Sequence, residues 1–199
     1  MFDGATERAF FDPANNVYYV AADGARRYLY RLSSPEYSIA ERIDADRVHY
    51  IFSISPDGEW LIVGAPPATG EGMQEVAIST RGLPRRMICS YCTLGAGPAR
   101  ELAPPISWTR DGRTLLVSLQ FASQEYWMGP SPSLAVPVRP GAMLPDLPAG
   151  GIESVDDYRR LTDARIIPQK NVLPGATSDQ LFTYQPTTLR NLYRLRLPD

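Results

Sequence analysis

The sequence predicts an all-β fold, a partial β-propeller of about four blades, each with three to four antiparallel strands. The first observation is a hairpin signal that occurs twice in closely similar form, as FSISPDGEWLIV at residues 52–63 and as ISWTRDGRTLLV at residues 106–117. The second is that strand-like segments follow each hairpin, so that a whole unit recurs every ~40–55 residues, as in propeller blades. A β-sandwich with coincidentally similar hairpins is the alternative that this pattern leaves open.

The turn residues of the two clear copies specify the hairpins. In the first, Pro56 presets its own φ, Asp57 can hydrogen-bond to the backbone that follows it, and Gly58 accepts a positive φ. In the second, Asp111 and Gly112 hold the same places. Apolar residues stand on both sides of each turn, which predicts a short strand before it and another after it.

A weaker third copy lies upstream, at FFDPANNVYYV, residues 10–20. It aligns Pro13 with Pro56 and Asn15 with Gly58, and asparagine tolerates a positive φ better than most residues do. Further β-like segments complete the units, at residues 26–32, 73–80, 133–138 and 191–197. We therefore expect a single propeller segment over residues 1–199, with units at approximately residues 8–49, 50–103, 104–164 and 165–199.

The SPDG of residues 55–58 and the TRDG of residues 109–112, each followed by an apolar strand, resemble the PD-type repeat of TolB-like propellers, relatives of the WD-repeat family. The chain is also similar to the C-terminal part of bacterial propeller proteins in which a winged-helix or Ser/Thr kinase domain precedes the propeller. Nothing in residues 1–199 resembles a kinase glycine loop or a recognition helix, so the resemblance implies the propeller alone. It is compatible with the bacterial envelope and with the cytoplasm.

The number of units predicts an open ring. Propellers usually close by pairing strands from the two ends of the chain, which removes the exposed sheet edge. We expect this chain to be the C-terminal portion of a longer propeller, or a copy that leaves an edge open. Further blades could come from a longer polypeptide or from a homodimer. A compact ring with residues 1–7 paired to residues 191–197 would contradict this expectation.

Cys89 and Cys92 form the sharpest chemical motif, C-x-x-C. Two thiols at this spacing can be structural, can form a local disulfide, can act as a redox pair, or can supply half of a metal site. The chain has 2 cysteines and 1 histidine, His49, so a complete zinc site would need an unusual set of carboxylates. We predict a disulfide or redox pair and no metal or other cofactor.

Other catalytic patterns are weaker. The chain has no G-x-S-x-G elbow, and His49, at the start of a predicted strand, is expected to be structural. Asp57 and Asp111 are expected to make turn hydrogen bonds. The proline- and glycine-rich segment 139–151 is predicted to be a surface connection.

A contact loop is predicted at Tyr126, Trp127 and Met128, because large apolar residues on a loop can mark an interaction surface. With 199 residues and 44% hydrophobic content the chain can bury one core. The net charge of −2 does not favour nucleic acid or an anionic membrane. No apolar run reaches the ~18 residues of a membrane-spanning helix, and the N-terminal residues do not read as a secretory signal.

These observations favour a non-enzymatic binding or sensory module that presents its loops to a protein or a small ligand, whose identity the sequence does not give. The alternative is a substrate-gating or regulatory propeller segment of a larger hydrolase or kinase polypeptide.

Overall fold

The structure is a computed structural model that describes residues 8–69, 72–90, 106–118, 133–153, 157, 159–168 and 172–183. Within these ranges the chain forms fourteen β-strands in four antiparallel sheets, three of four strands and one of two. In each sheet the strands follow one another in chain order, so each strand pairs with the strand that follows it. This order is the one expected when every unit is a local meander.

The sheets correspond to blades. The first blade holds β1 (Ala9–Phe11), β2 (Val17–Asp23), β3 (Arg26–Leu32) and β4 (Ala40–Arg42). The second holds β5 (Tyr50–Ile54), β6 (Trp60–Ala65), β7 (Gln74–Ser79) and β8 (Arg86–Ser90). The third holds β9 (Ile106–Trp108), β10 (Thr114–Ser118), β11 (Ser133–Pro137) and β12 (Arg165–Ile167), and the fourth holds β13 (Val172–Pro174) and β14 (Leu181–Thr183).

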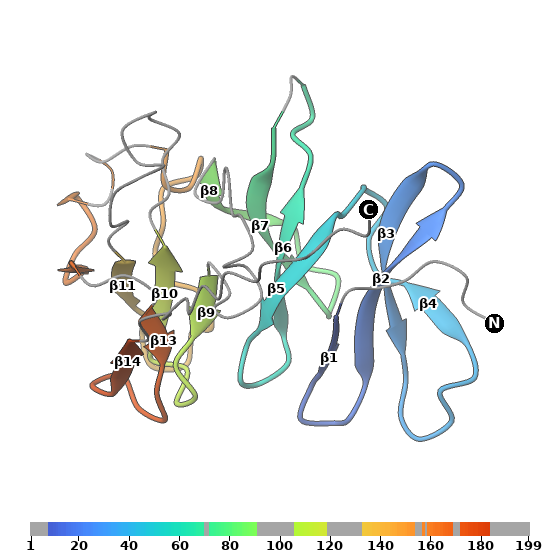
Figure 1. Ribbon diagram of the computed structural model, residues 1–199, viewed down its shortest axis with the longest axis horizontal. Coiled ribbons are helices and arrows are strands. Elements are labelled where there is room, and N and C mark those ends of the chain that lie inside the picture. The colour runs from blue at the N-terminus through green and yellow to red at the C-terminus, as the bar shows by residue number, and fades with distance from the viewer. Residues whose placement is uncertain are drawn as a thin grey trace, which may run out of the picture.

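The blades lie side by side along an arc, with the first blade and the β13–β14 hairpin at its two ends (Figure 1). The first strand of each blade is the innermost one, because β1 contacts β5, β5 contacts β9, and β9 contacts β13. This arrangement confirms the predicted partial β-propeller of four blades. A sandwich would instead pack two sheets face to face, and the alternative is therefore wrong.

Separate cores at the three junctions between blades explain why the blades stack. Leu61 and Val63 of β6 point toward the first blade and pack against its Leu29, whereas Ile62 points toward the third blade and packs near its Leu115. All five side chains are fully buried. Burial of one such side chain contributes about 1.5–3 kcal/mol, so a central blade is stabilised from both sides.

The segment 139–151 was predicted to be a surface connection. The structure corrects this prediction, because residues of the segment also pack against the core. Its Leu144 and Leu147 pack against the core between the second and third blades, and the indole Nε1–H of Trp108 donates to the Met143 carbonyl at 3.0 Å. Just beyond the segment, Ile152 forms a parallel bridge with Cys89. The prolines and glycines prevent a regular strand, but the apolar residues between them still supply buried surface.

The third blade extends further along the chain than the unit limits suggested. β12 pairs with β11 through Arg165 opposite Ala135, so residue 165 belongs to the third sheet although we placed it at the start of the fourth unit. Pairing of residues 1–7 with residues 191–197 lies outside the described residues. Where the structure is described, no helix has the length and apolar character needed to cross a membrane.

Candidate functional site: a row of interlocked turns

The turn of the second blade, residues 55–60, is closed by both backbone and side chains. The amide of Gly58 donates to the Ser55 carbonyl at 2.8 Å, with Gly58 at a φ of 77°. Asp57 Oδ1 accepts from the Ser55 hydroxyl at 2.6 Å and from the Glu59 amide at 3.0 Å. The Ser55 hydroxyl oxygen in turn accepts from the Trp60 amide at 2.9 Å. The S-x-D-G pattern therefore specifies a turn in which each polar residue has a definite partner.

The turn of the third blade, residues 109–114, repeats this geometry with threonine in place of serine. Asp111 Oδ1 accepts from the Thr109 hydroxyl at 2.7 Å and from the Arg113 amide at 3.1 Å. The Thr109 hydroxyl oxygen accepts from the Thr114 amide at 3.1 Å, and Gly112 has a φ of 69°. The repeated sequence thus encodes the same hydrogen bonds in both blades.

The turn of the first blade, residues 12–16, is a shorter version. The amide of Asn15 donates to the Asp12 carbonyl at 2.9 Å, and Asn15 has a φ of 64°, comparable to that of Gly58. Asp12 Oδ1 accepts from the Asn16 amide at 2.8 Å. Asparagine therefore takes the positive-φ position that glycine takes in the second blade.

The four turns interlock at one end of the blades, and we call residues 12–16, 55–60, 109–114 and 175–180 the turn row. A Cβ on Gly58 would lie 2.8 Å from Asp12 Cβ, and one on Gly112 would lie 3.7 Å from Pro56 Cγ. Asp111 Oδ2 accepts from the Ser178 amide of the fourth turn at 2.8 Å. Each turn therefore contacts the next one along the arc.

The charged state of two aspartates in the turn row is stabilised. For Asp111, desolvation is the largest single effect and acts to raise the pKa, but hydrogen bonds from the Thr109 hydroxyl and from two backbone amides together outweigh it and lower the pKa. The Thr177 hydroxyl, followed by the backbone amide of Asp179 itself, lowers the pKa of Asp179 despite the nearby charge of Asp111. Both groups are carboxylates at neutral pH and serve as hydrogen-bond acceptors.

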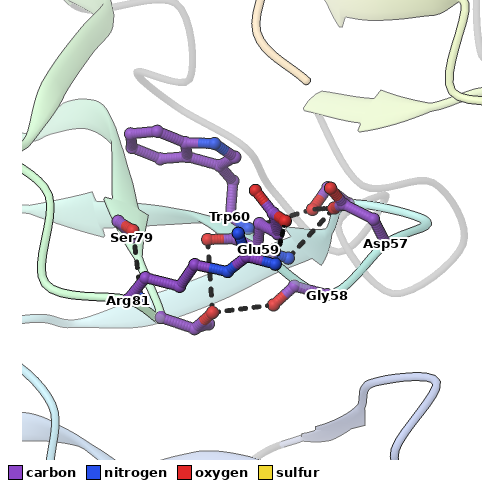
Figure 2. A network of polar contacts seen from close by, with 8 residues as sticks. Asp57, Gly58, Glu59, Trp60, Ser79 and Arg81 are labelled. Carbon is purple, nitrogen blue, oxygen red and sulfur yellow. Dashed lines mark hydrogen bonds and ion pairs between the residues drawn. The ribbon is translucent and has the colours of Figure 1, made fainter. Parts of the chain in front are cut away.

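A second layer of contacts braces the turn of the second blade (Figure 2). The Thr80 hydroxyl donates to the Gly58 carbonyl at 2.9 Å, and the Thr80 amide donates to the Glu59 carbonyl at 2.9 Å. Arg81 forms an ion pair with the Glu59 carboxylate, and its amide donates to the Ser79 hydroxyl oxygen at 3.1 Å. These contacts were not predicted from the sequence, although the S-T-R-G at the end of β7, residues 79–82, is itself a turn signal.

His49 lies apart from the turn row and has a structural position. Its amide donates to the Gly64 carbonyl at 2.8 Å, and its ring is half-buried, with its centroid 6.1 Å from that of Tyr50. Desolvation, followed by the positive charges of Arg27 and Arg47, lowers the pKa of His49. The imidazole is therefore neutral at pH 7.

Cys89 of β8 is fully buried and disulfide-bonded. The other cysteine of the motif, Cys92, lies outside the described residues, as do Tyr126, Trp127 and Met128 of the predicted contact loop. On β7, Glu75 pairs with Cys89 in register and is fully buried, a position that the sequence analysis did not single out. Among the described residues, no group of three or more His, Cys, Asp and Glu side chains is placed to hold a metal ion.

Comparison with known proteins gives one structural likeness. No protein-family model and no curated protein sequence matches the chain. A solved structure that is similar, with a TM-score of 0.46 and 17% identity, is a gluconolactonase from Xanthomonas campestris described as important in glucose secondary metabolic pathways. The likeness covers 92% of this chain and 55% of that chain, so this chain spans about half of its length.

This finding corrects the functional prediction. The structure that the chain resembles is an enzyme, which contradicts both the non-enzymatic binding module and the statement that the protein is not an enzyme. The prediction relied on the scarcity of catalytic motifs, and propeller folds carry unrelated functions on similar scaffolds. At this identity and TM-score the likeness assigns no reaction to the chain.

Proposed function

We propose that the chain is a substrate-gating or regulatory propeller segment of a larger hydrolase or kinase polypeptide. The observation that carries the proposal is the turn row, in which four consecutive turns are fixed to one another at one end of the blades. Such a row forms a rigid rim, and a rigid rim can restrict and orient a molecule that approaches that end of the propeller.

The chemistry of the rim favours orientation over proton transfer. Asp57 and Asp111 use side-chain oxygens to accept hydrogen bonds from their own turns, and Asp111 also accepts one from the fourth turn. The lowered pKa of Asp111 makes its carboxylate a poor general acid at neutral pH. The exposed tips of the turns nevertheless present both charges, since Arg110 and Arg113 flank Asp111. The rim is suited to polar contacts with a substrate whose reacting groups lie elsewhere.

The resemblance to TolB-like, PD-type propellers also supports this function. It rests on the SPDG of residues 55–58 and the TRDG of residues 109–112, whose hydrogen bonds repeat from blade to blade. Bacterial proteins of that kind join a propeller to a separate functional domain, which is the organisation proposed for this chain.

The proposal can be tested with steady-state kinetics on the natural polypeptide that contains these residues. Turnover would be measured with a panel of ester, lactone and peptide substrates, and separately with ATP and a protein substrate. Arg113→Ala removes a charge from the rim, and we expect KM to rise by about 3- to 10-fold with little change in kcat. This pattern is expected because the lost contact would have stabilised the bound substrate and the transition state equally. The matched control is Arg26→Ala, an exposed arginine in the hairpin between β2 and β3, at the opposite end of the first blade.

Two results would overturn the proposal. One is that the natural polypeptide turns over none of these substrates. The other is that Arg113→Ala and Arg26→Ala have the same kinetic constants as the wild type.

A further inference from the structure

The first two blades also meet at the end opposite to the turn row. The β2–β3 hairpin lies at that end, because the first turn lies at the other end of β2 (Figure 1). The segment 43–49, which joins β4 to β5, reaches the same end, since β5 runs from it toward the second turn. The Val48 amide donates to the Arg27 carbonyl at 3.0 Å, so the segment lies against the hairpin. Arg27, Arg47 and His49 come together here, and we call them the basic cluster.

Arg27 lies on the face of the first blade that packs against the second. Leu29, two residues further along β3, is fully buried in the core between these blades, and alternate residues of a strand share a face. Across the hairpin, Arg27 opposes Ala22. The adjacent Arg26 and Asp23 oppose one another and lie on the other face. The exposed Arg27 side chain therefore extends from the end of the junction with no carboxylate directly opposite it.

Arg47 and His49 are held beside Arg27 by the residue between them. Val48 is fully buried in the core between the first and second blades. The His49 amide donates to the Gly64 carbonyl at 2.8 Å, so the segment is hydrogen-bonded to both blades. The His49 ring is half-buried, and the charges of Arg27 and Arg47 both act on it. The three side chains are therefore close enough for one small ligand to lie among them.

The acidic residues of the same segment have a different partner. Asp44 Oδ2 accepts from Arg85 Nε at 2.7 Å, and Asp46 Oδ2 lies 3.5 Å from Arg85 Nη1. The Asp46 amide also donates to Asp44 Oδ1 at 2.8 Å. Among the described residues, neither Arg27 nor Arg47 forms an ion pair. The segment thus separates its charges, with both carboxylates at Arg85 and the basic cluster outside these ion pairs.

The chemistry of the basic cluster suits an oxyanion. Guanidinium groups donate paired hydrogen bonds to phosphate and carboxylate oxygens, and an imidazole N–H can donate one more. The fully buried Val48 and Ala65 of the adjacent core exclude water, which strengthens an electrostatic contact at its edge. We propose that the basic cluster binds an oxyanion, the phosphate or carboxylate group of a small ligand, at the junction of the first and second blades. This inference goes beyond the proposed function, because the basic cluster and the turn row lie at opposite ends of the blades and are tested separately.

Proton binding at His49 should be linked to anion binding. Desolvation, followed by the charges of Arg27 and Arg47, holds the pKa of His49 below its ordinary value of 6.5. A bound anion offsets the two arginine charges and therefore raises this pKa. By linkage, the anion binds more tightly as the pH falls through the pKa of His49, because the imidazolium attracts it.

The surrounding elements carry further charged groups whose positions bear on this linkage. They are Asp23 and Arg26 of the hairpin, Asp44 and Asp46 of the segment, Arg85 before β8, and Glu75 of β7, which is fully buried opposite Gly64. Glu71, in the connection between β6 and β7, lies outside the described residues. The arginines of the basic cluster are the charges that act on His49 most strongly.

Calorimetric titration of the natural polypeptide with sulfate, at constant ionic strength, tests the inference. Arg27→Gln and Arg47→Gln should each weaken sulfate binding by about 10-fold, because each removes a charged hydrogen-bond donor. The matched control is Arg26→Gln, which removes the same charge from the neighbouring residue on the other face. It should change the affinity by less than about 2-fold. Thermal melts verify that each variant is folded.

The pH dependence gives a second readout, because sulfate stays a dianion while His49 titrates. In the wild type, the affinity for sulfate should rise by about 3- to 10-fold from pH 8 to about pH 5.5, and in His49→Gln it should stay nearly constant. NMR of the histidine ring, assigned by comparison with His49→Gln, should give a higher pKa with sulfate than without it. This measurement needs no arginine variant, so it remains decisive if Arg27→Gln fails to fold.

Titrations with inorganic phosphate and with acetate identify the group that is bound. Tighter binding of phosphate would assign a phosphate-bearing ligand, and tighter binding of acetate a carboxylate-bearing one. The inference is wrong if none of the three anions binds at millimolar concentration, or if Arg26→Gln weakens binding as much as Arg27→Gln does. It is also wrong if sulfate binds and leaves the pKa of His49 unchanged, because the anion would then lie elsewhere on the molecule.

Discussion

The first and second blades have the same hairpin and the same order of strands, but they differ in what covers them. In the second blade, Leu61 after the turn is fully buried, and its neighbour Ile62 is fully buried on the other face. In the first blade, Tyr18 is buried on the face toward the second blade, whereas on the opposite face Tyr19 is buried but Phe11 is 61% exposed. The difference shows that the repeat specifies strands and turns, whereas burial depends on the neighbouring blade.

The largest difference between the two blades should appear when equivalent apolar residues are truncated. Leu61→Ala leaves a cavity between two sheets and should lower the free energy of unfolding by about 2–4 kcal/mol. Val17→Ala, at the equivalent position on the half-exposed face, should cost less than about 1 kcal/mol in a monomer. Urea denaturation of both variants at low protein concentration measures the difference. Equal costs would mean that the two faces are equally covered.

A glycine comparison examines the contact between the first two turns. Gly58→Ala must adopt a φ near 77° and places its Cβ 2.8 Å from Asp12 Cβ, so we expect a loss of about 2–3 kcal/mol. Gly24→Ala has a φ near 61° but nothing within 4 Å of its Cβ, so it should lose only about 1 kcal/mol. Thermal melts of the two variants give the comparison. A Gly24→Ala variant as unstable as Gly58→Ala would show that the turns do not press on one another.

The third prediction concerns pH and the contact between the third and fourth turns. Because the pKa of Asp111 is lowered on folding from its ordinary value of 3.8, its contribution is complete above that value and is lost as the pH falls through the lower folded value. Asp111→Asn should abolish this part of the acid dependence, with an effect below about 1 kcal/mol because the carboxylate is exposed. Urea denaturation from pH 7 to pH 2 measures it. Parallel pH profiles for the wild type and the variant would contradict the assignment.

The smallest effect should come from the exposed ion pair at the second turn, and Thr80 at the same turn provides the comparison. Arg81→Ala removes an ion pair whose arginine side chain is 68% exposed, and should cost no more than about 0.5 kcal/mol. Thr80→Val removes the hydroxyl that donates to the Gly58 carbonyl, and should cost about 1 kcal/mol. If Arg81→Ala proved the more damaging of the two, the ion pair and not the hydroxyl would brace the turn.

The sequence predicted the elements that depend on local chemistry. The positive φ values of Asn15, Gly58 and Gly112 follow from residue type, and the strands on either side follow from apolar patterning. The four-blade arrangement follows from the repeat, because a sheet that recurs in chain order can bury its faces against its neighbours. The weaker first copy was visible because asparagine is the common substitute for glycine at positive φ.

Features that depend on distant contacts could not be predicted. Nothing in segment 139–151 indicates that Leu147 packs between two blades, or that Ile152 will bridge to Cys89. The hydrogen bond from the Ser178 amide to Asp111 joins residues that are far apart in the sequence.

The central claim is that the burial of a blade depends on the blades that neighbour it, and hydrogen exchange tests it most directly. Backbone amides of β6 (Trp60–Ala65), which has a described blade on both sides, and of β2 (Val17–Asp23) should be compared under the same conditions. We predict that β6 is strongly protected and that β2 exchanges faster. Equal protection of β2 and β6 would contradict the account, because it would show that the first blade is covered as fully as the second.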